Sequence, residues 1–505
     1  MADDLGFNDV PWHNRNVFAP NLERLARTGV ILEQSYVQPI CTPTRSALMT
    51  GRYPIHTGRQ NGVLWPEEPA GLFTNLTLLP EYLRELGYDT HMVGKWHLGF
   101  CNESYLPTHR GFNSYSGYWT GSEDYYLHSR VSSTEPRLAG YDFREQDEVD
   151  RSAAGKYSAH LFAERAVTVI QAAKGKTKPM FLYLAFQSVH SPLQVPVEYE
   201  SHYMDVNNRA RRTYLGMVTA MDEAIGNITS ALKTSGLDKN TLIVFTTDNG
   251  GQTLNGGNNF PLRGNKATLW EGGTRGAAFV HGSMLEVPGR RNFALLHVTD
   301  WLPTLLSAGG GRPGQTPHGQ FSALIHYCAD LLPGIDGVDQ WETLVRPTQS
   351  SKRREMLYNI DPLQDGKNGH NAAIRVGKYK LIKGNPGKPS GWIPPPAVTN
   401  IDARENDGIF NDLEYLYNSP ELCPRQGPED DQVLLFDLSQ DPNEQLDLSK
   451  KYPNIVMKLK NVLSKYHSSM IPPDVKDKVA KGNPSHFGNI WSTGWCQAEP
   501  SSFEN

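Results

Sequence analysis

Two short apolar runs, each followed at once by polar residues, constrain the fold of this chain more than any other feature of its sequence. The run 180–186 leads through polar residues to His190, and the run 241–245 leads to Asp248 and Asn249. Short runs rich in Phe, Leu, Ile and Val are typical of buried parallel strands. Ligand sites of open α/β sheets lie outside the carboxyl ends of such strands. The sequence therefore predicts that these polar side chains belong to a site.

A helix is predicted between the two strands. Apolar residues there recur at alternating steps of four and three, the stripe of an amphipathic helix, with Gly236 as its stop: Tyr214, Val218, Met221, Ile225, Ile228 and Leu232. A second helix, over 79–86, precedes a predicted strand over 88–93 that runs into Lys95 and His97. Alternating helices and strands indicate the α/β class, with a large, mostly parallel sheet flanked by helices.

The pattern changes after about residue 345, where helices become rarer. Residues 372–383 read as a hairpin bent at 376–377, and 433–438 read as another strand. One amphipathic helix follows Pro453. We therefore expect a catalytic domain over residues 1–345 and a smaller C-terminal domain over 346–505, built from an antiparallel sheet covered by one helix.

Charge and hydropathy exclude two classes of partner. The 505 residues include 49 Lys and Arg against 54 Asp and Glu, a formal net charge of -5. No global basic field is present to hold nucleic acid or an anionic membrane. No run of about 18 apolar residues predicts a membrane span, and the start lacks the apolar segment of a signal peptide. Asp3 and Asp4 read as the loop after a strand, so we expect that an upstream segment is missing.

Five scattered cysteines match neither a zinc-ligand spacing nor a dense disulfide framework: Cys41, Cys101, Cys328, Cys423 and Cys496. An odd number leaves at least one unpaired. Three glycosylation sequons begin at Asn75, Asn102 and Asn227, which is compatible with a protein of the secretory pathway.

The sharpest motif is the segment 41–52. Pro43 lies near the start of a predicted helix that ends at Gly51, so Cys41 is expected at the positive helix end, where backbone N–H groups favour an anion. A lone cysteine is more often buried or disulfide-bonded.

Two pairs of polar residues offer only oxygen ligands, which suits calcium or magnesium and is a poor match for zinc. They are Asp3 with Asp4 and Asp248 with Asn249. Either pair alone is more often a turn or a helix cap. Their combination with the segment 41–52 favours a metal site.

The motifs together resemble the sulfatase family. Cys-x-Pro-x-Arg at 41–45, followed by Thr-Gly-Arg at 50–52, resembles the first family signature, and Gly-Lys-Trp-His-Leu-Gly at 94–99 resembles the second. The similarity extends over nearly the whole chain and is closest to the arylsulfatase B, N-acetylgalactosamine-4-sulfatase-like branch. It implies an alkaline-phosphatase-like α/β domain followed by a small C-terminal sheet.

The resemblance also implies a mechanism. A formylglycine-generating enzyme would oxidise Cys41 to formylglycine, whose hydrated form attacks sulfur with one hydroxyl and expels sulfate with the other. One calcium ion would be held by Asp3, Asp4, Cys41, Asp248 and Asn249. Arg45 would hold the diol and the carboxylates, and Lys95 would contact the sulfate. His97 would orient or deprotonate the diol, while His190 and Lys266 would contact the sulfate and protonate or stabilise the leaving oxygen.

The resemblance leaves several alternatives open. Thr44 replaces the usual Ser, and the chain has fewer cysteines than lysosomal vertebrate relatives. The substrate is a sulfate ester, such as an aryl sulfate or a sulfated carbohydrate like N-acetylgalactosamine 4-sulfate, and the implied location is lysosomal or secreted. A phosphoester or phosphonate hydrolase of the same fold is one alternative. A catalytically silent sulfatase-like binding protein is another, and it would hold if Cys41 were never oxidised.

Overall fold

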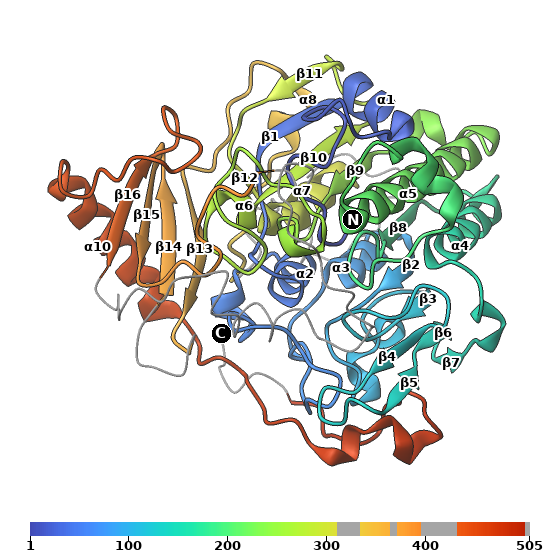
Figure 1. Ribbon diagram of the computed structural model, residues 1–505. Helices are drawn as coiled ribbons and strands as arrows, with labels where there is room; N and C mark the ends of the chain where they lie inside the picture. Colours follow the sequence, from blue (N-terminus) through green and yellow to red (C-terminus); the bar gives the residue numbers. More distant parts are fainter. Residues whose placement is uncertain (311–333, 364–370, 395–431, 500–505) are drawn as a thin grey trace.

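The computed structural model describes residues 1–310, 334–363, 371–394 and 432–499, and its larger part is built on two five-stranded sheets (Figure 1). The strands of the first sheet, in spatial order, are β7 (Glu148–Val149), β6 (Phe143–Glu145), β3 (Ser114–Tyr118), β2 (Asp89–Lys95) and β8 (Met180–Ala185). Those of the second are β9 (Ile243–Thr246), β10 (Arg275–His281), β1 (Val30–Tyr36) and β11 (Arg290–Asn292), with β12 (Leu296–His297) also paired to β1.

The N-terminal residues connect the two sheets. Met1 bonds to β8 through its amino group and the Leu184 carbonyl (2.8 Å), and its own carbonyl accepts from the Phe186 N–H (3.0 Å). Ala2 donates to the Thr246 carbonyl (2.9 Å) and forms a parallel bridge with Thr247. The chain therefore starts between β8 and β9, where Figure 1 marks the N-terminus. Asp3 and Asp4 follow directly at the carboxyl ends of both strands.

The α/β prediction is confirmed, but in place of one mostly parallel sheet there are two sheets, and each contains both parallel and antiparallel pairs. Strands β3, β2 and β8 run parallel, whereas β10 is antiparallel to both of its neighbours, β1 and β9. Neighbouring residues of β2 show that its sheet is covered on both faces. Val93 belongs to one buried apolar cluster, and Met92 belongs to a second cluster. Successive strand residues point to opposite faces, so a strand apolar at both positions must be buried on both.

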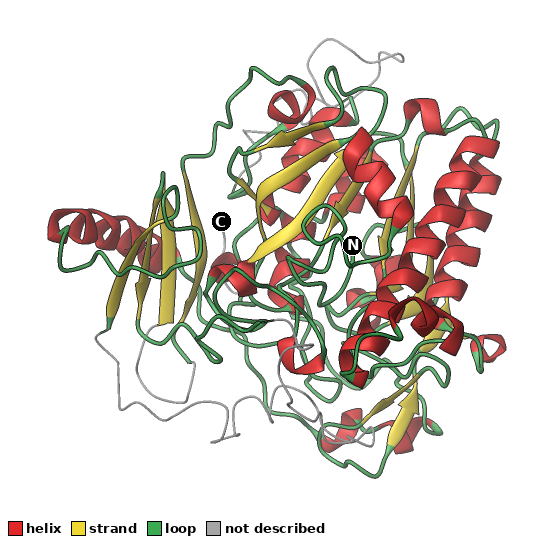
Figure 2. Cartoon of the chain, turned by 45° about the horizontal axis from the view of Figure 1, so that its top comes forward, coloured by secondary structure: helices red, strands yellow, loops and turns green. Residues whose placement is uncertain are grey.

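Helices cover both faces of the sheets, as Figure 2 shows. One group consists of α1 (Pro20–Thr28), α4 (Ser158–Ala173) and α5 (Arg209–Thr234). The other consists of α2 (Cys41–Thr50), α3 (Leu79–Glu85), α7 (Trp301–Ala308) and α8 (Trp341–Val345). The predicted helices over 214–232 and 79–86 are confirmed as α5 and α3 within a few residues. No helix in the described ranges is both long and apolar enough to span a membrane.

Smaller elements complete the larger part. Strands β4 (Ser129–Val131) and β5 (Ala139–Tyr141) form an antiparallel hairpin, and α6 (Glu271–Thr274) precedes β10.

The C-terminal sheet is antiparallel, as the sequence predicts, and it has four strands, the first of which the sequence analysis did not predict. They are β13 (Glu355–Asp361), β14 (Asn371–Val376), β15 (Tyr379–Lys383) and β16 (Val433–Asp437). The predicted hairpin bends at Gly377, whose φ of 59° is accessible to glycine at little cost. Helix α10 (Pro453–Ser469) packs Leu459 and Leu463 onto one face of this sheet. After β15, residues 384–394 form neither helix nor strand.

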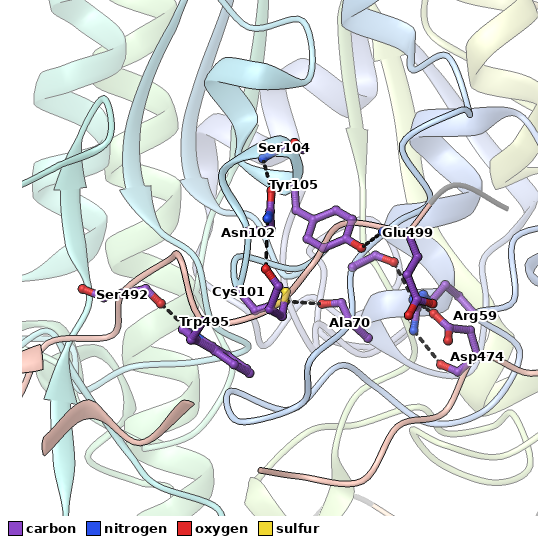
Figure 3. Close-up of a disulfide and its surroundings, with 12 residues drawn as sticks. Arg59, Ala70, Cys101, Asn102, Ser104, Tyr105, Asp474, Ser492, Trp495 and Glu499 are labelled. Carbon is purple, nitrogen blue, oxygen red and sulfur yellow. Dashed lines mark hydrogen bonds and ion pairs between the residues drawn. A yellow bond between two sulfur atoms is a disulfide. The ribbon is translucent and has the colours of Figure 1, made fainter. Parts of the chain in front are cut away.

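The chain after α10 returns to the larger part and is tied there by a disulfide. Cys496 is bonded to Cys101, 395 residues earlier, and Figure 3 shows Tyr105 and Arg59 nearby. The Tyr105 hydroxyl accepts from the Glu499 N–H (2.8 Å), and Arg59 pairs with Asp474. Cys328 and Cys423 lie outside the described residues, and a domain boundary near residue 345 stays a prediction.

Buried charges join the two parts of the molecule. Lys380 on β15 contacts Glu271 at the start of α6 (3.0 Å) and Glu444 (2.7 Å), and all three side chains are fully buried. Burial and the neighbouring Glu271 raise the pKa of Glu444 to about 7, although Lys380 opposes the shift. Burial alone would raise the pKa of Glu271, but Lys380, Arg275 and Arg375 lower it.

The raised pKa of Glu444 predicts a pH-dependent stability. The folded protein binds a proton at Glu444 more tightly than the unfolded chain, so this stabilisation is complete below about pH 4.5 and is lost as the pH rises to about 7. Glu444→Gln is neutral at every pH. We expect the free energy of unfolding of the parent to fall relative to this variant by roughly 3 kcal/mol across that window. Urea unfolding at several pH values measures it, and identical pH profiles would contradict the prediction.

Candidate active site

Helix α2 positions Cys41 at its first residue. Ile40, the residue before the helix, is extended, and Gly51 ends the helix with φ 66°, its N–H bonded to the Ala47 carbonyl. The predicted helix from Pro43 to Gly51 is therefore confirmed, beginning two residues earlier. Cys41 is a free, buried thiol whose Sγ lies 3.8 Å from Oδ1 of Asp3. The N–H groups of the first turn favour an anion at this position.

Three carboxylates and one amide converge beside Cys41. Asp3 and Asp4 come from the N-terminal segment, and Asp248 and Asn249 come from the end of β9; all four are buried. The Asp4 N–H donates to Oδ1 of Asp248 (3.3 Å), and Nδ2 of Asn249 donates to Oδ1 of Asp4 (2.7 Å). The carboxyl ends of separate strands thus bring together residues that are about 245 positions apart.

Three cations pair with these carboxylates. Arg45, one helical turn after Cys41, places Nη2 2.9 Å from Oδ2 of Asp248 and 3.6 Å from Oδ2 of Asp3. Lys95, at the end of β2, contacts Asp3 (2.5 Å), and Lys266 contacts Asp4 (2.8 Å). Both lysines are almost fully buried, at 0% and 3% exposed, so the surface role that is common for lysine does not apply to them.

The charges separate the pKa values of the two adjacent carboxyls. Burial and the charge of Asp248 raise the pKa of Asp3 to about 7, against the effect of Lys95 and Arg45. Burial would also raise the pKa of Asp4, but Lys266 and His190 lower it to about 2. Burial raises the pKa of the Cys41 thiol to about 12, so at neutral pH the unmodified thiol is protonated.

The two histidines differ in how they contact this cluster. Nε2 of His190 is 3.7 Å from Oδ2 of Asp4. His97 bonds through Nε2 to the Leu64 carbonyl (3.0 Å), and in the described structure none of its hydrogen bonds joins it directly to the carboxylates. Burial, with Lys95 and Arg45 nearby, lowers the pKa of His97 well below its usual value, so the ring is neutral.

The donor set fits a hard cation. Oδ1 of Asn249 is buried and has no hydrogen-bond partner in the described structure, although a buried amide oxygen normally has one. With the carboxylates of Asp3, Asp4 and Asp248 it forms a set of oxygen ligands of the kind that calcium prefers. Ligand atoms of Asp3, Asp4, Cys41 and His190 lie within 4.8 Å of one another. The residues present therefore fit the calcium ion that the family resemblance implies.

The structure brings together Cys41, Arg45, Lys95, His190, Lys266 and the four predicted oxygen ligands. The hydrogen bonds of His97 run instead to Leu64 and Thr42. Thr44 keeps the hydroxyl of the usual Ser, accepting from the Gln38 N–H (2.9 Å) and donating to the Asp248 carbonyl. The sequence did not reveal that Thr42 and the Leu64 carbonyl hold His97. A backbone carbonyl carries no sequence signal, and Thr42 is an unspecified position of the motif.

Known proteins share both sequence and fold with this chain. The profile of the family described as Sulfatase matches residues 1–311. Arylsulfatase J of Mus musculus is 40% identical over 516 aligned residues, covering 99% of this chain and 80% of that protein. N-acetylgalactosamine-6-sulfatase of Mus musculus is 26% identical, covering 94% and 86%.

Two solved structures extend the comparison. That of Ps i-CgsB in complex with k-i-k-neocarrahexaose has a TM-score of 0.73 and 25% identity, covering 97% of this chain and 95% of that one. The phosphonate monoester hydrolase of Agrobacterium radiobacter shares only the fold, with a TM-score of 0.57 and 16% identity over 93% and 95%. The family profile covers more than half of the chain, and the 40% identical relative covers nearly all of it. This chain belongs to the sulfatase family, the hydrolases of sulfuric esters.

Proposed function

We propose that this protein hydrolyses sulfate esters of aryl compounds or carbohydrates, using a formylglycine made from Cys41 and one calcium ion. The observation that carries the proposal is the buried cluster in which Cys41 starts a helix beside Asp3. Three carboxylates and three cations surround it. Such a site holds a cation on one side and an anionic ester on the other.

The protonated state of the Cys41 thiol is consistent with its conversion to formylglycine. A cysteine acts as a nucleophile only as the thiolate, and a pKa of about 12 leaves the thiol protonated at neutral pH. The hydrated aldehyde would supply one hydroxyl for attack and another for release of sulfate.

Each surrounding residue has a defined task in this proposal. Oxygens of Asp3, Asp4, Asp248 and Asn249 would hold the calcium ion, which would supply positive charge at the reacting group. Arg45 fixes Asp248 and Asp3 in place through its guanidinium.

The remaining side chains would contact the ester. Lys95 and Lys266 would neutralise sulfate oxygens, and His190, next to Asp4, would protonate the leaving oxygen. His97 would accept a proton from the nucleophile, for which its neutral ring is suited.

Two measurements test the proposal. The first is the mass of the peptide spanning Ile40 to Arg45, which changes when the thiol becomes an aldehyde and so separates an enzyme from a silent binding protein. The second is hydrolysis of an aryl sulfate and the matched aryl phosphate. We expect conversion of Cys41 and a clear preference for the sulfate. An unmodified thiol, or a faster reaction with the phosphate, would refute the proposal.

The buried lysines give a quantitative prediction. Lys95→Ala and Lys266→Ala should each lower kcat/KM by about two to three orders of magnitude, because positioned charges act strongly where water is excluded. Lys233→Ala, an exposed lysine on α5, is the control and should behave like the parent. Thermal melting confirms that folded protein is assayed. A loss of less than about fivefold for both variants would remove these lysines from the site.

The proposal includes a secretory route, with the protein lysosomal or secreted. The Cys101–Cys496 disulfide is typical of oxidising compartments. Asn75 and Asn227 of the sequons are exposed, which is compatible with a glycoprotein, whereas Asn102 is half-buried and donates to the Cys496 carbonyl (3.0 Å). A formylglycine-generating enzyme is the implied maturation partner. The neocarrahexaose in the structure of the similar Ps i-CgsB supports a carbohydrate substrate. N-acetylgalactosamine 4-sulfate is the example that we propose to test.

A further inference from the structure

A closed cycle of hydrogen bonds holds His97. The hydroxyl of Thr42 accepts from the Leu64 N–H (3.2 Å) and donates to the His97 carbonyl (3.2 Å). The Leu64 carbonyl in turn contacts Nε2 of His97 (3.0 Å). One side chain next to Cys41 therefore fixes both the backbone of His97 and the residue that binds its ring.

This cycle of hydrogen bonds determines which nitrogen of the His97 imidazole carries the proton. A carbonyl oxygen only accepts, so Nε2 must be the donor. The ring is neutral, and Nδ1 is therefore bare. Nδ1 is buried and has no hydrogen-bond partner among the described residues. Buried polar atoms are normally paired, so the lack of a partner leaves the lone pair of Nδ1 available to accept a proton.

Gly121 confines the ring from another side. A Cβ built at Gly121 would lie 2.6 Å from Cε1 and 2.7 Å from Nε2 of His97, closer than real carbon atoms approach. Gly121 has no positive φ, so its backbone could accommodate alanine. A larger residue is excluded at position 121 only because the imidazole of His97 fills the space that its side chain would need.

We infer that Thr42 and Gly121 are positioning residues that hold His97 in the Nε2–H tautomer with Nδ1 as its proton acceptor. The inference deepens the proposed function and rests on it for its kinetic consequence. In the reaction Nδ1 takes a proton from the attacking hydroxyl, whose oxygen keeps the electron pair. The resulting imidazolium retains its Nε2–H bond to the Leu64 carbonyl. Without this arrangement the ring could present its protonated nitrogen, which cannot act as a base.

Nitrogen NMR of the full-length protein labelled with ¹⁵N-histidine tests the tautomer without any activity assay. The signals of His97 are identified by their loss in His97→Gln. We expect a protonated, pyrrole-like Nε2 and a bare, pyridine-like Nδ1. A protonated Nδ1 would overturn the inference even if the enzyme proves to be a sulfatase.

Kinetics of Gly121→Ala test the positioning. A displacement of a catalytic group by about 1 Å can cost a hundredfold, so we expect kcat to fall by about 10²-fold while KM changes by less than about threefold. The matched control is Gly391→Ala, because a Cβ at Gly391 meets nothing within 4 Å and its φ is not positive. It should behave like the parent. Gly121 is distant in sequence from Cys41, so maturation should be unaffected.

Thr42 gives a second, independent variant. Thr42→Val keeps the shape and removes the hydroxyl, and we expect kcat per converted Cys41 to fall by about tenfold to a hundredfold. Thr42→Ser restores the hydroxyl and should recover kcat to within about threefold of the parent. Peptide mass gives the converted fraction for each variant. If Gly121→Ala and Thr42→Val both keep kcat within about threefold of the parent, the positioning role is refuted. If the parent itself hydrolyses no sulfate ester, the proposed function fails. In that case the NMR result alone decides the tautomer of His97.

Discussion

Cys41→Ser is expected to fold like the parent chain and to lose multiple turnover of sulfate esters by at least about three orders of magnitude. Serine provides one hydroxyl, so it can accept a sulfate group but has no second hydroxyl to expel it. The side chain differs from cysteine by one atom, and the buried space beside Asp3 accommodates it. Steady-state assays over many enzyme equivalents of an aryl sulfate measure the loss.

The trapped product distinguishes this explanation from simple damage. Cys41→Ser incubated with substrate should gain at most one sulfate per chain, detectable by intact mass, whereas Cys41→Ala has no hydroxyl and should gain none. Thermal melting of both variants close to that of the parent confirms the fold. Turnover at the parent rate by Cys41→Ser, with no adduct, would show that the proposed nucleophile is wrong.

Asp248→Ala is expected to abolish calcium binding and lower kcat/KM by roughly three orders of magnitude. Asp248 is a proposed ligand, and it also holds Arg45 and the Asp4 N–H, so its loss disturbs several members of the site at once. Metal analysis of the purified protein gives the calcium content, and oxygen ligands are expected roughly 2.3–2.6 Å from the ion.

A second buried carboxylate provides the control. Asp222 on α5 accepts from the Leu22 N–H (2.7 Å) at the start of α1, away from the site. Asp222→Asn should keep its calcium and its activity. Zinc at full occupancy with no alkaline-earth ion in the parent would refute the calcium site.

Much of the fold could be predicted because local patterns and packing agree. The stripe of α5 follows the helical period and is largely buried, and the continuous apolar run of β8 is a buried or half-buried strand. The site was predictable in part because its residues follow strand ends or start a helix, as Asp248 and Cys41 do. The resemblance to a family then related positions that no local pattern connects.

The remaining features depend on contacts between distant backbone groups. Nothing local shows that β10 runs antiparallel between β1 and β9, because strand direction is set by how the chain returns. The bond from His97 to the Leu64 carbonyl is equally invisible, since every residue has a carbonyl. The pairing of Lys380 with Glu444 joins residues of ordinary charged type that sequence patterns place on a surface.

The Cys101–Cys496 bond also determines how the molecule would respond to proteolysis. A single cut anywhere between these two residues leaves both fragments covalently joined. Cys41, Lys95 and His97 would stay with the first fragment, and Lys266 would pass to the second if the cut fell between Cys101 and Lys266. Such a nicked protein would migrate as one band without reductant and as two with it, and its two halves of the site would remain linked until the disulfide is reduced.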